Sequence, residues 1–330
     1  MKRLKTALIG FGRMAAGYAD DPINAKWFPY ATHAQVLREH PAFDWCAVVD
    51  PSPQARDAAA TRWSIAATAA QVGALPNAAE IEVAVLATPP EARLGLLDQL
   101  PSLKAVVVEK PLGVDLSAAE VFVRECRQRG LAGVVNFPRR FDAELRKLRD
   151  GGLADSLGDV QAAFGTYGNG LRNNGSHLID LMQMLLGPVD IAVPVQGAKA
   201  FTEGPIPGDS NFAFTLGWPN GLVAAVQPLA FSAYREVGLD LWGTKGRLQI
   251  LNESLTLLKT PVGANRQLSC AQEINHEATE LSYGELGYAL YALYDNLAAH
   301  LRNDAPLWCS LQEGLDSMSV VERLMEHRQL

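Results

Sequence analysis

The sequence has few cysteines and no long hydrophobic run. Its 330 residues include only four cysteines, which lie far apart and form no CxxC pair: Cys46, Cys126, Cys270 and Cys309. A zinc site or a redox dithiol therefore has no support, and we expect no metal site. Reduced, mostly buried thiols are typical of a cytosolic protein.

The chain also lacks an excess of positive charge. Its net charge of −7 gives no reason to expect binding to nucleic acid or to an anionic membrane. No segment approaches the ~18 consecutive apolar residues of a membrane span. The run Ala7–Gly12 is too short for the core of a signal peptide and fits a first β-strand better. We therefore expect a cytoplasmic protein without a membrane partner.

Residues 1–135 alternate between short β-rich runs and helical patterns, which predicts a parallel sheet with crossover helices. The expected helices are Gln54–Arg62, Glu91–Leu100 and Ser117–Arg129. The expected strands are unbroken apolar runs, as in strands buried on both faces: Thr6–Ile9, Trp45–Val49, Val83–Ala87, Ala105–Val108 and Gly133–Asn136.

Residues 136–330 follow another pattern, that of an α+β domain with a mostly antiparallel open sheet. Its expected strands are separated by Gly, Asn and Pro: Val160–Thr166, Asn211–Leu216, Val223–Pro228, Glu236–Trp242 and Arg247–Ile250. Its expected helices are Phe141–Arg149, a helix from Ser176, Glu285–Arg302 and Leu311–His327.

A glycine motif directly follows the first expected strand. It has the form GxGxxA and comprises Gly10, Phe11, Gly12, Arg13, Met14 and Ala15. In a Rossmann domain the first Gly allows a tight turn, the second lets the backbone approach a pyrophosphate, and the small last residue permits close packing. The phosphates would then lie at the N-terminus of a helix. The alternative is an ordinary glycine turn.

Asp50 ends the second expected strand and indicates the choice of cofactor. A carboxylate there can accept both ribose hydroxyls of NAD and would repel the 2′-phosphate of NADP. The alternative is an Asp that caps a turn. Asp50 lies farther from the glycines than the usual ~20 residues, because Tyr18–Thr32 extends the intervening segment.

Two further strands end in segments that we expect to contact the cofactor, because ligands bind at the carboxyl ends of strands in such sheets. A Lys there, next to a nicotinamide, can polarise or deprotonate an alcohol. The segments supply Ala87, Thr88 and Pro89 after one strand, and Glu109 and Lys110, followed by Pro111, after the next.

His177 is a histidine of the second domain that stands at the start of an apolar helical pattern. It begins a helix whose apolar residues recur at helical spacing, and Asp180 is its i,i+3 neighbour. From the residues alone, a structural histidine at a helix start is the favoured interpretation, and a functional one is the alternative.

Taken in order, GxGxxA, Ala-Thr-Pro-Pro, Glu109-Lys110-Pro111 and His177 with Asp180 resemble the Gfo/Idh/MocA oxidoreductases, relatives of glucose–fructose oxidoreductase and inositol dehydrogenase. The resemblance runs from Gly10 to the turn Gly243–Gly246, and more loosely to the C-terminus. It implies an NAD-dependent dehydrogenase acting on CH–OH donors, with Lys110 beside the nicotinamide and His177 as catalytic acid/base. It also implies a homodimer or homotetramer formed through the second domain.

The chain departs from the family at two positions. Asn173 stands where many members have an Asp that contacts substrate; Asn can hydrogen-bond a hydroxyl but cannot take its proton. Arg93 stands where many members have His. The segment from Tyr167 to His177 resembles a subgroup associated with lipopolysaccharide and lipid A precursors, some members of which oxidise the 3-hydroxyl of UDP-N-acetylglucosamine.

A UDP-N-acetylamino sugar is therefore the expected substrate. A diphosphate needs cations in this acidic half of the chain, and arginine can grip phosphate with two donors. The expected substrate contacts are Lys110, Arg139, Tyr167, Arg172, Asn173 and His177, with Arg140 a further candidate for the diphosphate. Surface or interdomain pairing is the alternative for Arg139 and Arg140.

Two other functions stay open from the sequence. One is an inositol or free-sugar dehydrogenase of the same family. The other, suggested by Asn173, is a protein that binds NAD or a nucleotide sugar without turnover. The presence of both Lys110 and His177 argues against the second.

Overall fold

The computed structural model describes residues 2–202 and 204–328. It divides into two compact units, one of residues 1–141 and 287–315 and the other of residues 142–286 and 316–330. This differs from a single boundary at residue 135, because the segment 287–315 belongs with the first unit. That segment contains the whole of helix α9 (Ala289–Asn303), which packs on α2 (His33–Glu39) and β6 (Ala132–Val135).

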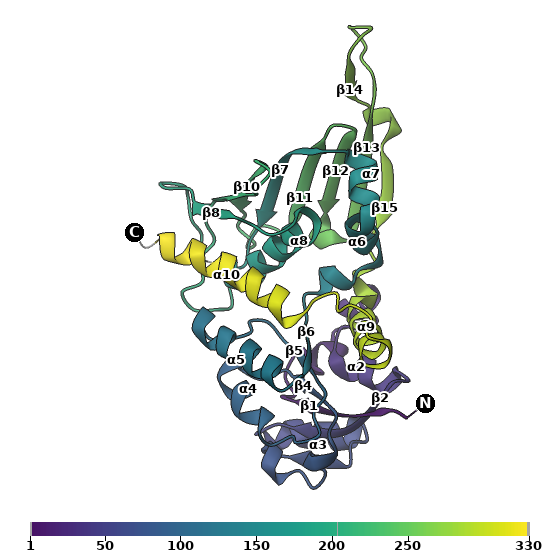
Figure 1. The fold of residues 1–330 in the computed structure, drawn as a ribbon, viewed down its shortest axis with the longest axis vertical. Helices are drawn as coiled ribbons and strands as arrows, with labels where there is room; N and C mark the ends of the chain where they lie inside the picture. The colour runs from purple at the N-terminus through teal and green to yellow at the C-terminus, as the bar shows by residue number, and fades with distance from the viewer. Residues whose placement is uncertain (1, 203, 329–330) are drawn as a thin grey trace. The chain divides into compact units, whose positions relative to one another are not determined.

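The first unit is built on a six-stranded parallel sheet of order β3-β2-β1-β4-β5-β6 (Figure 1). This is the doubly wound order of a dinucleotide-binding fold, so the predicted fold class is confirmed. The five predicted strands are present, and the prediction missed the short β3. The strands are β1 (Leu4–Ile9), β2 (Phe43–Val49), β3 (Ala67–Ala69), β4 (Val83–Leu86), β5 (Ala105–Val108) and β6.

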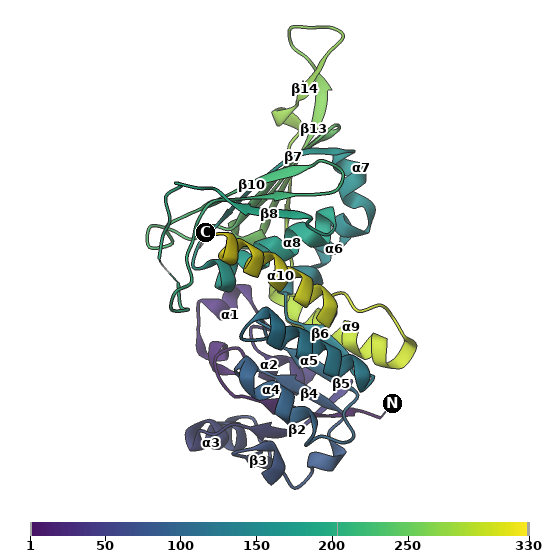
Figure 2. The same ribbon diagram turned by 60° about the vertical axis from the view of Figure 1, so that its left-hand side comes forward.

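Helices cover both faces of this sheet. Figures 1 and 2 show α4 (Pro90–Leu97) and α5 (Leu116–Gln128) side by side on one face, and α2 and α9 on the other. Every residue of β4 and β5 is fully buried as a result. Helix α3 (Pro53–Arg62) follows β2. Within the described residues, no helix has the length and apolarity required to cross a membrane.

The prediction of an α-helix that begins at the glycine motif is wrong. Gly12–Gly17 forms one helical turn, followed by the 3-10 helix η1 (Gly17–Asp20) and the short α1 (Asn24–Trp27). Gly17 and Pro22 account for the break, because both residues disfavour a helix interior. The first longer helix, α2, begins only at His33.

The second unit contains a nine-stranded sheet of order β14-β13-β12-β11-β7-β10-β9-β8, with β15 paired to β13. All pairs are antiparallel except β10 with β7. The β13–β14 hairpin extends beyond the rest of this sheet (Figure 1). The strands are β7 (Val160–Tyr167), β8 (Ile191–Pro194), β9 (Phe214–Gly217), β10 (Val223–Pro228), β11 (Gly238–Gly243), β12 (Gly246–Leu251), β13 (Thr256–Ala264), β14 (Gln272–Ile274) and β15 (Glu280–Tyr283).

The helix predicted over Phe141–Arg149 is shorter than expected. It forms α6 (Ala143–Lys147), then an irregular turn in which Gly151 has φ +126°, then α7 (Leu153–Leu157). A positive φ of this kind is readily adopted only by glycine. The two neighbouring glycines therefore divide the segment into two short helices.

One face of the second sheet packs against helix α8 (Ser176–Leu186) and the end of α10 (Leu311–Arg328). A Cβ on Gly165 in β7 would lie 2.9 Å from Cε of Met182, so α8 sits directly on the strand. The opposite face exposes a group of apolar side chains on neighbouring strands: Phe164, Ile191, Val193 and Val223. An antiparallel sheet can face water on one side, but a contiguous apolar patch is typical of an interaction surface.

We expect the chain to form a homodimer or homotetramer that covers this exposed face. Light scattering at micromolar concentration should give at least twice the chain mass of 35.6 kDa. Phe164→Lys should shift the mass toward that of the monomer, because its 51% exposed ring lies on the face. Leu268→Lys, on the β13–β14 loop, is the control and should leave the mass unchanged. A wild-type monomer would contradict this expectation.

Candidate active site

The glycine loop after β1 is held against the loop after β4. Gly10 has φ +86°, and a Cβ there would lie 2.5 Å from the carbonyl oxygen of Ala87. Only glycine fits such a conformation and such a contact. Around Gly12, in contrast, no heavy atom lies within 4 Å of the position of a Cβ. The backbone at Gly12 is thus open to a close-fitting ligand such as a pyrophosphate.

Asp50 contacts the glycine loop directly. Its Oδ2 accepts the N–H of Phe11 (2.7 Å), and its Oδ1 accepts the N–H of Ser52 (2.8 Å). Asp50 therefore caps a turn, as the alternative interpretation of this residue expects. Each carboxylate oxygen has a further lone pair, so ribose hydroxyls can still be accepted. Arg56, which the sequence reasoning missed, donates to the carbonyl oxygens of Asp50 and Pro51.

Two buried polar atoms at the same edge of the sheet have no hydrogen-bond partner among the described residues. They are Oγ1 of Thr88, after β4, and Oδ1 of Asn136, after β6. Buried polar atoms are nearly always hydrogen-bonded, so unpaired ones next to an open glycine loop fit a bound polar ligand. These residues suit a dinucleotide. No cluster of three or more His, Cys, Asp or Glu suited to a metal occurs in the described residues.

Arg93 joins the loops that follow β4 and β5. Its guanidinium is 2% exposed and donates to the carbonyl oxygens of Thr88 (2.8 and 3.2 Å) and Pro111 (2.5 Å). Burial lowers the pKa of Arg93 to about 10. Arg93 therefore ties together the two segments that carry the predicted cofactor contacts.

Glu109 and Lys110 follow β5 at this edge. Asn136 Nδ2 donates to Oε1 of Glu109 (2.7 Å), and Nε2 of His33 lies 2.8 Å from the same oxygen. Burial acts to raise the pKa of Glu109, but the hydrogen bonds from His33 and Asn136 and the charge of Lys110 lower it below its ordinary value. Glu109 therefore holds a negative charge beside Lys110.

His177 lies in the first turn of α8 and is half-buried. The turn before it, Leu171–Gly175, is held by Asp209, whose carboxylate accepts the N–H groups of Arg172 and Asn173 (2.9 Å each). Gly170 allows this approach, because a Cβ there would lie only 2.1 Å from Oδ2 of Asp209. Asp209 comes from a distant loop, and no local pattern indicated its role.

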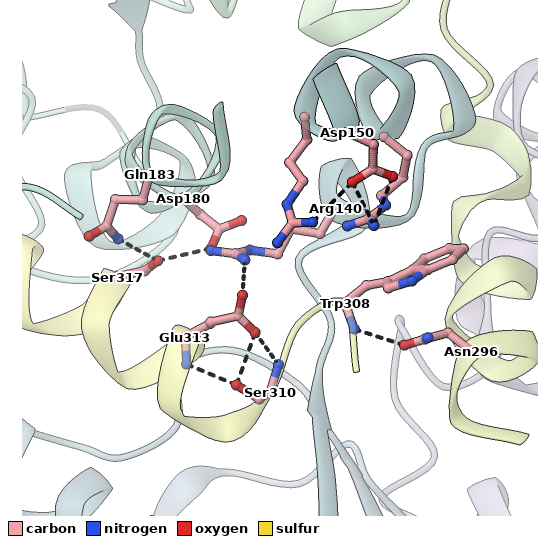
Figure 3. Close-up of polar contacts among 11 residues, drawn as sticks. Arg140, Asp150, Asp180, Gln183, Asn296, Trp308, Ser310, Glu313 and Ser317 are labelled. Carbon is pink, nitrogen blue, oxygen red and sulfur yellow. Dashed lines mark hydrogen bonds and ion pairs between the residues drawn. The ribbon is translucent and has the colours of Figure 1, made fainter. Parts of the chain in front are cut away.

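Asp180 is fully buried one turn further along α8. Its Oδ1 accepts the hydroxyl of Ser317 (2.9 Å), which in turn accepts Nε2 of Gln183 (3.0 Å), as Figure 3 shows. This contact links α8 to α10 within the second unit. It gives Asp180 a clear structural role in holding the helix that carries His177.

The expected contact of Tyr167 with substrate needs correction. Its ring is fully buried in the apolar core of the second unit. Its hydroxyl donates to the carbonyl oxygen of Phe212 (2.8 Å) and accepts the N–H of the same residue (2.9 Å). With its surface covered and both roles of the hydroxyl filled, Tyr167 is a core residue.

The arginines proposed for a diphosphate are also engaged elsewhere. Arg140 pairs with Glu313 (2.6 Å), which is itself bound by Ser310 (Figure 3). Arg139 is only 5% exposed. Arg172 forms a two-pronged ion pair with Glu322 at 2.9 and 2.8 Å. Arg140 is thus paired inside the first unit, which is neither the surface pairing nor the interdomain pairing expected as its alternative.

Asn173 also makes a local contact. Its Nδ2 donates to the carbonyl oxygen of Asn169 (3.0 Å), across the turn before α8. The side chain is half-buried. Its amide therefore contributes to the shape of the loop that precedes His177.

The doubly wound sheet and its open glycine loop define a dinucleotide-binding protein of the Rossmann class. Two family models match the chain: an oxidoreductase-family NAD-binding Rossmann fold over residues 4–137, and the C-terminal alpha/beta domain of the same family over residues 165–329. The chain belongs to the Gfo/Idh/MocA oxidoreductase family, and its cofactor is NAD.

Among curated proteins, the chain is similar to trans-1,2-dihydrobenzene-1,2-diol dehydrogenases. It is 27% identical to the Bos taurus enzyme over 190 residues and 32% identical to the Sus scrofa enzyme over 189 residues. Each match covers 52% of this chain, and 56% and 55% of the respective relatives. The chain thus spans about half the length of the curated relatives it matches.

Solved structures share the fold over nearly the whole chain. The WlbA dehydrogenase from Bordetella pertussis, in complex with NADH and UDP-GlcNAcA, has a TM-score of 0.71 at 18% identity and covers 99% of this chain and 97% of its own. A super-repressor mutant of Gal80p from Saccharomyces cerevisiae has a TM-score of 0.74 at 14% identity, with 99% and 96% covered. At such identities the likeness shows the fold alone.

The two loop glycines make a matched test of the cofactor site. Gly12→Ala should leave the melting temperature unchanged, because space exists for the methyl group, but should weaken NAD binding at least ~10-fold, or about 1.4 kcal/mol. Gly10→Ala should instead destabilise the fold by more than ~1 kcal/mol, because alanine is strained at positive φ. Calorimetric titration and thermal melts check both. Unchanged NAD affinity in Gly12→Ala would contradict the assignment.

Proposed function

We propose that the protein is an NAD-dependent dehydrogenase that oxidises a ring hydroxyl of a sugar or another cyclic polyol. The observation that carries the proposal is the carboxyl edge of the first sheet, where an open glycine loop, unpaired buried polar atoms and the Glu109–Lys110 pair come together. A site of this kind holds a nicotinamide cofactor with a cationic side chain next to its reactive end.

In the proposed reaction, bound NAD supplies the hydride acceptor. His177 takes the proton of the substrate hydroxyl. The C–H bond at the carbon that bears this hydroxyl breaks at the same time, and its hydrogen leaves as hydride to NAD. Lys110 donates a hydrogen bond to the hydroxyl oxygen and stabilises the negative charge that develops on it. Asn173 orients the substrate by hydrogen bonding, since an amide cannot act as the base. Arg93 holds the backbone of the segment that contains Lys110. Glu109 places a negative charge beside Lys110.

Within this class, a small cyclic diol or polyol is the substrate that we favour over a nucleotide sugar. The arginines expected to bind a diphosphate are paired with Glu313 and Glu322 or buried. The matched curated relatives are named for a cyclic diol that carries no phosphate. A nucleotide sugar of the kind found among lipopolysaccharide precursors is therefore the second candidate substrate.

A UDP-N-acetylamino sugar, oxidised at its 3-hydroxyl, is that second candidate. Its support is the Asn174-Gly175-Ser176-His177 motif of the sequence, together with Arg172, whose side chain stays 38% exposed beside Glu322. A UDP-sugar could bind by displacing this ion pair. Exposed or partly exposed ion pairs contribute little stability, so such an exchange is energetically feasible.

A binding protein without turnover is the alternative from another class. The fold is shared with a protein described as a super-repressor mutant, so architecture does not decide between enzyme and binding module. Retention of Lys110 and His177 favours the enzyme. Formation of NADH on incubation with a polyol separates the two.

Replacement of either reactive side chain should abolish most turnover. We expect Lys110→Ala and His177→Ala each to lower kcat about 10²-fold or more, because both groups act on the hydroxyl proton and charge. The dissociation constant for NAD and the melting temperature should change little. Asn173→Ala should mainly raise KM. Steady-state kinetics beside NAD titration test this, and a variant with full kcat would contradict the assigned role.

A substrate panel should distinguish the two candidate substrates. Inositols, free hexoses and cyclic diols are compared with UDP-N-acetylglucosamine, with NADH formation as the readout. We expect the uncharged ring alcohols to have the higher kcat/KM. If only the UDP-sugar yields NADH and a 3-keto product, and Arg172→Ala abolishes that reaction, then the nucleotide-sugar candidate is right and our preference is wrong.

A further inference from the structure

Four side chains from separate elements of the first unit meet in a buried chain of polar contacts. His33, the first residue of α2, has its Nδ1 2.8 Å from the hydroxyl of Tyr294 in α9. Its Nε2 lies 2.8 Å from Oε1 of Glu109, which also accepts Nδ2 of Asn136 (2.7 Å). The side chains of His33 and Tyr294 are fully buried. None of the sequence motifs includes His33 or Tyr294.

One arrangement of hydrogen bonds satisfies the contacts of His33 with both of its partners. Burial raises the pKa of Tyr294 well above its ordinary value, so its hydroxyl keeps its proton. That hydroxyl can donate to Nδ1 of His33, and the N–H at Nε2 can then donate to Glu109. Glu109 is then a carboxylate that accepts two hydrogen bonds at one oxygen.

This chain ends beside the residue proposed to contact the reacting hydroxyl. Glu109 precedes Lys110 directly, and its negative charge favours the charged form of a neighbouring amine. A buried carboxylate keeps its charge only if hydrogen bonds and opposite charges offset the loss of water. His33 supplies one of those hydrogen bonds, and Tyr294 orients His33 to donate it. The charge beside Lys110 therefore depends on two residues of α2 and α9.

We propose that His33 and Tyr294 are positioning residues that keep Glu109 ionised and oriented, and through it hold Lys110 as a charged hydrogen-bond donor. The inference rests on the proposed dehydrogenase function for its catalytic consequence. Arg93 of α4, which is tied to the neighbouring loops, is a further charged group that interacts with Glu109.

A pair of variants at His33 separates positioning from structure. His33→Phe removes the donor to Glu109, whereas His33→Gln keeps an N–H at about the position of Nε2. We expect His33→Phe to lower kcat by on the order of 10- to 10²-fold, since misplacing a group next to the chemistry has effects of this size. His33→Gln should recover most of the loss. Tyr294→Phe should give a smaller loss in the same direction, and NAD affinity should stay unchanged in all three.

His40→Phe is the matched control. His40 is a buried histidine of the same unit that packs near Tyr294 but bonds Asp295 and not Glu109. His40→Phe should lower the melting temperature about as much as His33→Phe does, with little change in kcat. Equal kcat losses in the two variants, or no recovery by His33→Gln, would show that His33 acts only on stability and would overturn the proposal.

A second readout needs no substrate, so it stays valid if the dehydrogenase assignment fails. Acylation of Lys110 by an amine-specific reagent is followed by mass spectrometry as a function of pH in the NAD-free protein. If Glu109 loses its charge in His33→Phe, Lys110 loses a neighbouring anion and should react at lower pH than in wild type. His40→Phe should leave the profile unchanged. If His33→Phe does not shift the pH profile of Lys110 acylation, the proposed positioning role of His33 is wrong. If the profile shifts but no substrate yields NADH, only the dehydrogenase function is refuted.

Discussion

The close contact between the backbone of Gly10 and the carbonyl of Ala87 is the constraint on which the site depends. It brings the loops after β1 and β4 together at the carboxyl edge of the parallel sheet, and no side chain fits between them. Asp50 adds a hydrogen bond to Phe11, so the loop is held from the β2 side as well. With the loop fixed in this way, Gly12 is left with open space where a pyrophosphate can approach.

Buried charge then organises the other half of this edge. Arg93 and Glu109 are both largely removed from water, and a buried charge is tolerated only when its hydrogen-bonding groups are satisfied. Arg93 meets this condition through the carbonyls of Thr88 and Pro111, and Glu109 through Asn136 and His33. The loops carrying the cofactor contacts are therefore held by polar interactions inside the unit, which suits a site that must stay ordered before its ligand binds.

Much of this arrangement could be predicted from local sequence, and part of it could not. The unbroken apolar runs of β4 and β5 and the glycine spacing predict the first sheet, because strands buried on both faces have apolar residues at every position. The roles of Asp209 and His33 leave no such pattern, since each depends on a contact with a residue far away in the chain. Tyr167 was misjudged for the same reason: a polar hydroxyl beside a motif says nothing about burial. The helix expected at Gly12 failed because Gly17 and Pro22 override the motif.

We propose that the protein moves a hydride from a ring carbon of its substrate to NAD. The most direct test uses the ring alcohol that the wild-type enzyme oxidises, labelled with deuterium at the reacting carbon. Mass spectrometry of the isolated NADH reports where the label goes. We expect the deuterium to appear on the nicotinamide ring of NADH. Unlabelled NADH, with the deuterium released to water, would contradict direct hydride transfer and with it the assigned roles of the site.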